Sequence, residues 1–355
     1  MVFNKKQGKF IHQVIEQWAE QGTVPPEMAA RLHESITIRP FDWKKPAKYS
    51  FWTAIICFVI AVAAILRDEV LIGILKQIFT ASAMLRSLMP ALCAAGLFYL
   101  GFARRRRYPH RIFSTEAVFF VGILFCSGSI ASFGEAVDTG SGHFSLLFLL
   151  STLVYGVLGL ALSSKLIWAF SLLSLGSWFG TETGYISGWG AYCLGMNFPM
   201  RFVLFGLVLT GVSFWFRHVR LLKSFSHVTQ VIALLYLFIA LWLLSIFGNY
   251  GDLSDWTFVG QIELLHWGLL FALAAIAAIV FGLKYDDYTS RAFGVTFLFI
   301  NLYTRYFEYF WDTTHKAVFF LIPAVSLWAL GVHAEKLWTL EFLKTAPTQK
   351  PENHK

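Results

Sequence analysis

Four polar residues form a regular series near the end of the chain. Asn301, Arg305, Glu308 and Asp312 stand at positions i, i+4, i+7 and i+11, so a helix would place all four side chains on one face. The segment is otherwise apolar and aromatic, and a charged side chain in hydrocarbon costs about 2.5–3.5 kcal/mol on insertion scales. The series therefore indicates either an internal salt bridge between Arg305 and Glu308 or a cavity in which Arg305 binds an anionic group.

A second polar group stands at the start of the preceding apolar segment. Glu263 and His266 have the Glu-x-x-His spacing of carboxylate-bridged di-metal sites, but such sites need that element twice and the sequence holds it once. We therefore predict neither a metal nor a cofactor, and interpret the pair as a polar cap beneath Trp256 and Trp267. Together with Arg201, the pair reaches the same third of the predicted helices as the Arg305 series, where one shared ligand-binding pocket would fit.

Signatures of soluble enzymes do not occur in this sequence. It has no Gly-x-Ser-x-Gly, no phosphate-binding Walker pattern and no His-Glu-x-x-His. His143 lies in a polar segment with Glu135 and Asp138, and we expect it to be a solvated loop residue. No catalytic residue is predicted.

The composition predicts an integral membrane protein. Of the 355 residues, 57% are hydrophobic and 14% are charged, which differs from the balance of soluble domains. A spanning helix needs about 20 mostly apolar residues. We predict an all-α, polytopic transmembrane bundle of about ten spans, at residues 50–66, 88–103, 113–133, 144–162, 165–180, 198–217, 227–247, 261–282, 292–310 and 317–334.

Basic residues fall mainly on one side of this topology. With the N-terminus inside, most of the 29 Lys and Arg residues are on the inner side, and the exceptions are Arg67, Lys76, Arg86, Arg201, Arg305 and Lys316. The positive-inside rule then places both termini in the cytoplasm. Anionic lipid accounts for the basic inner face, so we do not predict nucleic-acid binding. The first 48 residues are polar, and we expect the first span to be an uncleaved anchor.

The segment 68–87 has the pattern of an amphipathic helix and not that of a membrane span. Glu69, Lys76 and Ser87 recur at helical spacing on one face, opposite leucine and isoleucine residues. We predict an amphipathic helix that lies in the outer interface. An eleventh span at this place would invert every later segment.

The polar N-terminus predicts two short helices. Residues 5–21 carry an apolar face, Gly22 stops the helix, and Pro26 and Glu27 open a second helix that runs to Glu34. Two short helices bury little core alone, so this hairpin must dock on the membrane side of the protein or bind a protein partner. The predicted domains are a cytoplasmic N-terminal hairpin at 1–48, a transmembrane domain at 49–334 and a cytoplasmic polar tail at 335–355.

Two motifs resemble a known family. The string from Trp18 to Leu32, WAEQGTVPPEMAARL, and the string from Asn301 to Asp312, NLYTRYFEYFWD, are similar to the opening hairpin and the late arginine–aromatic signature of the bacterial membrane proteins classed as "domain of unknown function 2157". The resemblance implies a multi-pass protein of the bacterial inner membrane. It implies no reaction, because the activity of that family is unassigned.

Glycines recur every four residues at Gly176, Gly180, Gly184 and Gly188. If the helix continues that far, they form a small-residue stripe for close helix packing. Otherwise they belong to a glycine-rich outer loop in which they make turns.

Three functions are consistent with these features. A non-enzymatic scaffold or sensor with a polar pocket in the outer leaflet half is favoured, with the bilayer and a membrane or cytoplasmic protein as partners. A transporter or flippase-like protein for an anionic or amphiphilic solute is the second, although no convincing inverted repeat supports it. The third is a membrane-embedded enzyme acting on a lipid-linked substrate, with Glu263, His266, Glu308 or Asp312 as acid and base.

Overall fold

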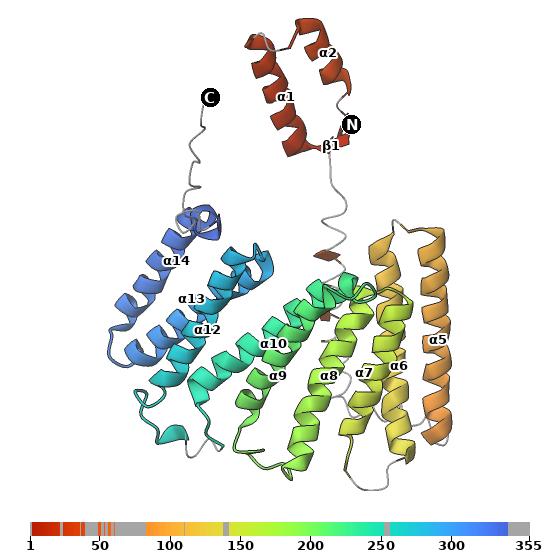
Figure 1. Ribbon diagram of the computed structural model, residues 1–355, viewed down its shortest axis with the longest axis vertical. Coiled ribbons are helices and arrows are strands. Elements are labelled where there is room, and N and C mark those ends of the chain that lie inside the picture. Colours follow the sequence, from red (N-terminus) through yellow and green to blue (C-terminus); the bar gives the residue numbers. More distant parts are fainter. Residues whose placement is uncertain are drawn as a thin grey trace, which may run out of the picture. The chain divides into compact units, whose positions relative to one another are not determined.

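The computed structural model describes residues 2–21, 24–35, 37–39, 83–109, 111–137, 142–251 and 256–339, and positions 49, 50, 53, 56, 57 and 60. The chain divides into two compact units, Met1–Ala136 and Val137–Lys355, which are described separately (Figure 1). The division falls inside the predicted 49–334 domain. Most of the predicted first span at 50–66 and of the predicted interfacial helix at 68–87 lies outside the described residues.

The first unit begins with two helices and two short strands. The helices are α1 (Lys5–Glu20) and α2 (Pro26–Ser35), and Glu27 lies in the first turn of α2. The strands β1 (Val2–Asn4) and β2 (Thr37–Arg39) pair in parallel, which the helical patterning of the sequence does not indicate. Strand β1 comes immediately before α1 in the chain and β2 comes after α2, so their pairing holds the two ends of this segment together.

Two long helices complete the first unit, α5 (Ala83–Arg107) and α6 (Ile112–Val137). Our prediction placed a boundary between residues 87 and 88, but α5 is continuous from Ala83 and contains Pro90. Within this hairpin the Ser129 hydroxyl donates to the Ser87 carbonyl at 2.7 Å, and Arg86 pairs with Glu135 at 3.2 Å. Both contacts anchor the first turns of α5 to α6, so these turns belong to the helix pair.

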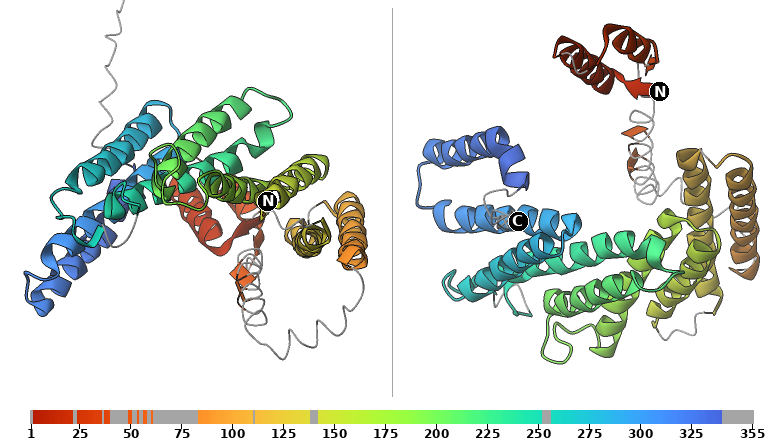
Figure 2. Two further views of the ribbon diagram at one scale, coloured as in Figure 1. Left: turned by 90° about the horizontal axis from the view of Figure 1, so that it is seen from below. Right: turned by 45° about the horizontal axis from the view of Figure 1, so that its top comes forward.

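The second unit consists of a series of helices. They are α7 (Ser145–Ala161), α8 (Lys165–Ile186), α9 (Phe198–Phe216), the single 3-10 turn η1 (Lys223–Phe225), α10 (Ser226–Phe247), α12 (Leu265–Lys284), α13 (Tyr288–Phe310) and α14 (Lys316–Thr339). Sequential helices pack most closely as the pairs α7–α8, α9–α10 and α12–α13 (Figure 2). Helix α14 continues past residue 334 into the predicted polar tail.

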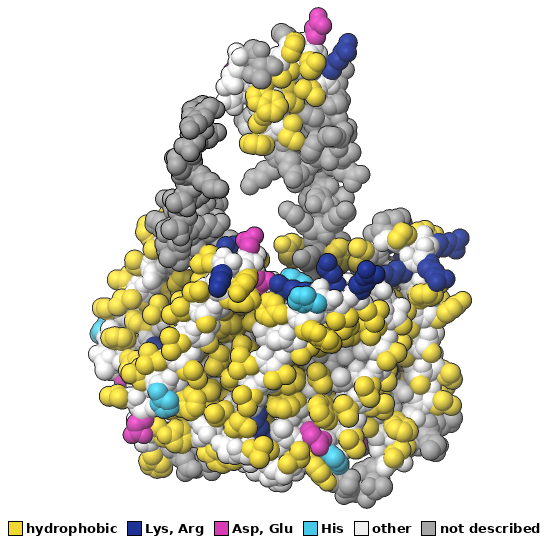
Figure 3. All heavy atoms as spheres, viewed as in Figure 1, with side chains coloured by type: hydrophobic (Ala, Val, Ile, Leu, Met, Phe, Trp, Pro, Cys, Tyr) yellow, Lys and Arg dark blue, Asp and Glu magenta, His cyan; other side chains and the backbone are white. Residues whose placement is uncertain are grey.

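Five described helices are long and apolar enough to cross a bilayer, so the structure is that of an all-helical membrane protein apart from the strand pair. They are Arg86–Arg107, Ile112–Val137, Phe198–Phe216, Lys223–Phe247 and Leu265–Lys284. Ser145–Ala161 and Lys316–Ala329 are shorter apolar helices. Figure 3 shows the corresponding surface, in which hydrophobic side chains cover most of the helices.

Polar caps fix where several helices start. The Ser164 hydroxyl accepts from the Ile167 N–H at 3.3 Å and begins α8, and the Asn197 side chain accepts from the Met200 N–H at 3.1 Å and begins α9. Asp287 begins α13 in the same way. Such caps satisfy backbone N–H groups that have no partner inside the helix.

Small residues allow the paired helices of the second unit to approach closely. A Cβ on Gly206 of α9 would lie 2.6 Å from the Leu237 nitrogen of α10, and one on Gly294 of α13 would lie 2.6 Å from the Ala275 carbonyl of α12. Backbone contact of this kind is typical of helices that associate within a membrane. These positions tolerate no larger side chain without separation of the helices.

The glycine repeat has both of the roles considered from the sequence, helix packing and turn formation. Gly176, Gly180 and Gly184 are buried inside α8, where their faces meet Tyr236, Phe202 and Trp189 in turn. Gly188 lies just beyond the helix with φ +62°, a conformation that favours glycine. The stripe therefore packs the helix through Gly184 and makes a turn at Gly188.

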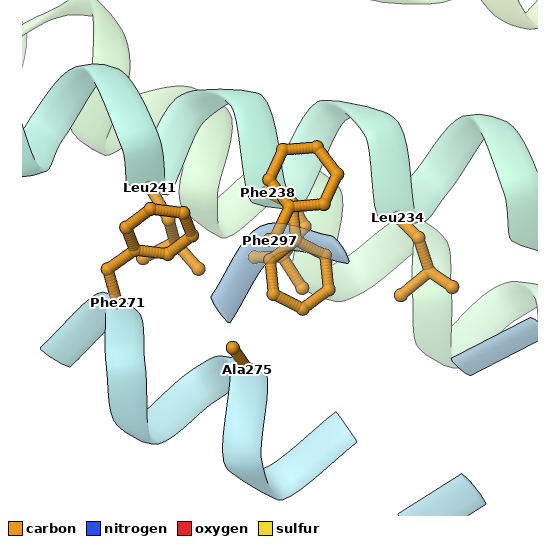
Figure 4. Close-up of a cluster of buried hydrophobic side chains, with 7 residues drawn as sticks. Leu234, Phe238, Leu241, Phe271, Ala275 and Phe297 are labelled. Carbon is orange, nitrogen blue, oxygen red and sulfur yellow. The ribbon is translucent and has the colours of Figure 1, made fainter. Parts of the chain in front are cut away.

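A phenylalanine cluster joins α10, α12 and α13. Phe238 of α10 stacks on Phe297 of α13 with ring centroids 5.0 Å apart, and Phe271 and Ala275 of α12 are fully buried against them (Figure 4). Leu234 and Leu241 extend the cluster along α10. This core holds together the three helices that carry the polar residues of interest.

Candidate functional site

Arg305 and Glu308 form a two-pronged ion pair on α13. Arg305 Nη1 lies 2.6 Å from Glu308 Oε2, and Arg305 Nη2 donates to Glu308 Oε1 at 2.8 Å. The side chains are 15% and 23% exposed, respectively. Their i, i+3 spacing allows this contact within one helix, and the parallel geometry is that of a strong arginine–carboxylate pair. The structure therefore contains the Arg305–Glu308 salt bridge, which is one of the two alternatives predicted from the sequence.

A third contact ties Arg305 to a different helix. Its Nη2 also donates to the Ser245 carbonyl of α10 at 2.8 Å. Ser245 is fully buried and stands in the last turn of α10, where carbonyl groups have no partner within the helix. A positive charge at a helix C-terminus is favourable, so Arg305 caps α10 as well as pairing with Glu308. Nothing in the sequence points to this partner, which is 60 positions away.

Asn301 binds the backbone of α12. Its Nδ2 donates to the Gly268 carbonyl at 2.9 Å, and the side chain is 5% exposed. The stem of Arg305 passes the same glycine, because a Cβ on Gly268 would lie 3.3 Å from Arg305 Cδ and 3.5 Å from Nε. Gly268 is therefore the point on α12 at which both polar side chains of α13 converge.

A cavity of about 390 Å³ lies beside these residues. Asn301, Arg305 and Gly268 line it, and its other walls are the apolar side chains of Leu265, Leu269, Ala272, Leu298, Phe299 and Leu302. Asn301 Oδ1 and Arg305 Nε are buried and have no hydrogen-bond partner among the described residues. A buried polar atom left in this state costs roughly 1–3 kcal/mol, so the two atoms mark an incomplete polar site.

Arg201 is held in a separate place. Its Nε donates to the Met196 carbonyl at 3.0 Å, its Nη2 donates to the Ala191 carbonyl at 2.9 Å, and its guanidinium lies 4.3 Å from the Phe198 ring centroid. The side chain is 2% exposed. Arg201 therefore secures the loop between α8 and α9, and the structure does not bring it to the cavity.

Two asparagines reinforce the same loop. Asn197 Nδ2 donates to the Gly248 carbonyl at 2.7 Å, and Asn249 Oδ1 accepts from the Asn197 N–H at 2.9 Å. These contacts bind the segment before α9 to the segment after α10. The cap position of Asn197, immediately before an apolar helix containing Pro199, is the only signal of this role in the sequence.

The remaining predicted site residues lie at the surface. Glu263, His266 and Asp312 are exposed, and within the described residues no hydrogen bond or ion pair joins their side chains to Arg305. The His266 ring lies 4.8 Å from that of Trp267, and Trp256 Nε1 donates to the Ile246 carbonyl. In the part of the chain that the structure describes, no group of three or more His, Cys, Asp or Glu could hold a metal ion.

His143 belongs to a polar cluster that the sequence analysis missed. Its Nε2 lies 2.9 Å from Glu182 Oε2, its ring stacks on Tyr185 at 3.9 Å, and the Ser145 hydroxyl donates to the same carboxylate oxygen at 2.5 Å. The Ser145 bond, followed by His143, lowers the pKa of Glu182. His143 lies in the loop before α7, as expected, but it is not a freely solvated side chain, because the last turns of α8 carry Glu182 to the start of α7. Both groups bind the carboxylate, so no serine–histidine nucleophile results.

A second network lies at the opposite ends of the helices. Arg217 Nη2 donates to Asp287 Oδ1 and Gln230 Oε1, both at 2.8 Å, and Gln230 Nε2 donates to Asp287 Oδ2 at 2.6 Å. Burial raises the pKa of Asp287, but hydrogen bonds from Ser290, Arg217 and Gln230 outweigh it and lower the pKa below its usual value. This network joins α9, α10 and α13 at the end where the basic residues gather.

Compared with protein-family models, curated proteins and solved structures, the chain matches none of them. Apart from the strand pair of β1 and β2, the fold defines the class of an all-helical membrane protein.

Proposed function

We propose that this chain is a multi-pass protein of the bacterial cytoplasmic membrane that acts as a non-enzymatic scaffold or sensor. The proposal includes about ten spans, both termini in the cytoplasm, and kinship with the domain of unknown function 2157 proteins. Five apolar helices support the membrane location. The Arg217 network, at the basic ends of α9, α10, α12 and α13, supports an inner position for those ends.

The surface of α1 and α2 carries the proposal of a scaffold role. Ile15 and Ala29 are buried, whereas Phe10, Trp18 and Met28 remain exposed, with Phe10 at 66%. Fully burying a side chain of this size gains roughly 1.5–3 kcal/mol. Several such residues on two short helices therefore favour a binding surface over a solvated one.

The charges of α1 and α2 favour a protein partner over the anionic leaflet. Helices α1 and α2 carry four basic residues and four glutamates, Lys5, Lys6, Lys9 and Arg31 against Glu16, Glu20, Glu27 and Glu34, and the remaining basic residues of the 1–48 segment, Arg39, Lys44, Lys45 and Lys48, all follow α2 in the chain. Attraction to anionic lipid needs a net basic segment. The exposed apolar residues of α1 and α2 are thus proposed to contact a membrane or cytoplasmic protein.

Site-specific photocross-linking in intact cells tests this role. A photoreactive phenylalanine analogue at Phe10 of the full-length protein should give one discrete protein adduct. The same analogue at Glu16, which is exposed and lies about 120° around α1 from Phe10, should not give that adduct and is the matched control. Adducts only with lipid, or the same adduct from both positions, would refute the proposed partner surface.

The cavity favours a second candidate, a flippase-like carrier of an amphiphile. Its walls are apolar, it lies beside a charged pair, and in the proposed orientation it is in the outer leaflet half. Carriage requires access from both leaflets in turn. Equal labelling of an introduced cysteine at Ala272 from both sides of the membrane would favour this candidate, and labelling from the outer side alone would favour the sensor.

A further inference from the structure

We infer that the cavity between α12 and α13 binds a neutral amphiphile, with a hydroxyl or primary-amide head and a single apolar chain. The inference rests on the proposed function, since it takes this cavity as the ligand site of the outer half. Three features of the cavity indicate the class of ligand: two buried polar atoms, the charge around them and the apolar walls.

The unpaired atoms define the head group. The Gly268 carbonyl accepts from Asn301, which fixes the Nδ2 atom on that side and leaves Oδ1 as an acceptor without a donor. Arg305 Nε is a donor without an acceptor. A hydroxyl or a primary amide supplies one donor and one acceptor at once. A carboxylate supplies acceptors only and would leave Asn301 Oδ1 unsatisfied.

The charge around the cavity argues for a neutral head as well. Both terminal nitrogens of Arg305 already bind acceptors, at Glu308 and at the Ser245 carbonyl. The carboxylate of Glu308 cancels the charge of the guanidinium. An anionic head would therefore meet a neutral pair, with a negative group within the same helical turn, and would gain little attraction.

The apolar walls define the tail and its route of entry. Leu269 and Leu302 are 56% and 61% exposed, on a surface that faces hydrocarbon in the proposed topology. The volume of about 390 Å³ lies within the range of small-molecule sites. A chain lying between α12 and α13 would enter sideways from the bilayer, with its head at Asn301 and Arg305.

Photolabelling with matched probes tests the inference. The full-length protein in phosphatidylcholine–phosphatidylglycerol nanodiscs is exposed to three diazirine probes that share one alkyl chain and end in an alcohol, a primary amide or a carboxylate. The alcohol and the amide should label peptides of α12 and α13 about ten-fold more than the carboxylate, the ratio expected for one unsatisfied hydrogen bond. Equal labelling by the carboxylate would overturn the neutral head.

Two variants separate this site from general lipid contact. Asn301→Leu should lose the preference for the alcohol, and Ala272→Phe should fill the cavity and lose labelling by all three probes. Ser213→Ala removes a buried hydroxyl of α9 away from the cavity and should label as the unmodified protein does. Unchanged labelling of Ala272→Phe would overturn the site even if Asn301→Leu fails to fold. The Phe10 cross-link is measured separately, so its loss would refute the partner surface and not this ligand.

Discussion

Replacing Arg305 with alanine should lower the free energy of unfolding by about 2–4 kcal/mol, somewhat less than the roughly 3–5 kcal/mol seen for fully buried pairs. The substitution removes both contacts with Glu308 and the bond to the Ser245 carbonyl. Glu308 is then left as a mostly buried carboxylate without a cation. The loss is below the full range because the Arg305 and Glu308 side chains are still 15% and 23% exposed, so water can solvate part of the unpaired carboxylate.

The double substitution Arg305→Met with Glu308→Leu should restore most of that loss. Replacing a buried ion pair by apolar side chains of similar size is often neutral or stabilising. The hydrogen bond to the Ser245 carbonyl stays lost in the double variant. Its free energy of unfolding should therefore lie within about 1 kcal/mol of that of the unmodified protein. The free energies would be measured by SDS titration of the purified protein in mixed micelles, with tryptophan fluorescence as the signal.

The comparison of single and double variants decides the role of the pair. If the double variant is as unstable as Arg305→Ala, the loss does not come from an unpaired Glu308, and the salt-bridge interpretation fails. If it is stable but has lost a cellular phenotype, Arg305 serves a ligand as well as Glu308, as expected if a head group binds Arg305 Nε.

Three further predictions use other parts of the molecule. Gly206→Ala should destabilise the fold by about 1–3 kcal/mol, because its Cβ would meet the Leu237 backbone at 2.6 Å; Gly211→Ala on the same helix meets nothing within 4 Å and should be neutral or slightly stabilising in the same SDS titration. Asp287 has a lowered pKa, so its contribution to stability should be present above about pH 3.9 and be lost as the pH falls through the lower folded value; Asp287→Asn should flatten that acid limb in unfolding measured against pH. Deleting residues 1–40 should leave membrane insertion intact, because three lysines still precede the first predicted span; degradation of the truncated chain as fast as an unfolded control would show that α1 and α2 belong to the structural core.

The positions of the helices follow from the sequence where apolar runs meet clear caps. The predicted span 198–217 corresponds to Phe198–Phe216, and 227–247 corresponds to Ser226–Phe247. Asn197 and the Pro199 that follows it fix one of these starts locally. The predicted end of the 165–180 span is less accurate, because α8 continues to Ile186. Glycine at positions 180 and 184 reads as a turn signal in the sequence, but helix packing overrides that propensity.

The candidate site was predictable only within one helix. The spacing of Arg305 and Glu308 on α13 implies their contact, since both partners lie within a single turn. Ser245 and Gly268 could not be identified, because they reach the site through the packing of α10 and α12, and a backbone carbonyl leaves no mark in the sequence. Arg201 was assigned to the site from its predicted depth alone, whereas loop carbonyls nearer in the chain bind it.

Cysteine accessibility across the membrane tests the account most directly, because both the cytoplasmic hairpin and the outer cavity depend on the orientation of the helices. Leu194 is 91% exposed in the loop between α8 and α9, and Ser224 is exposed between α9 and α10. In a background without native cysteines, an impermeant maleimide should label Leu194→Cys in intact cells and Ser224→Cys only after permeabilisation. Labelling of Ser224→Cys from outside, with Leu194→Cys protected, would contradict the orientation on which both proposals rest.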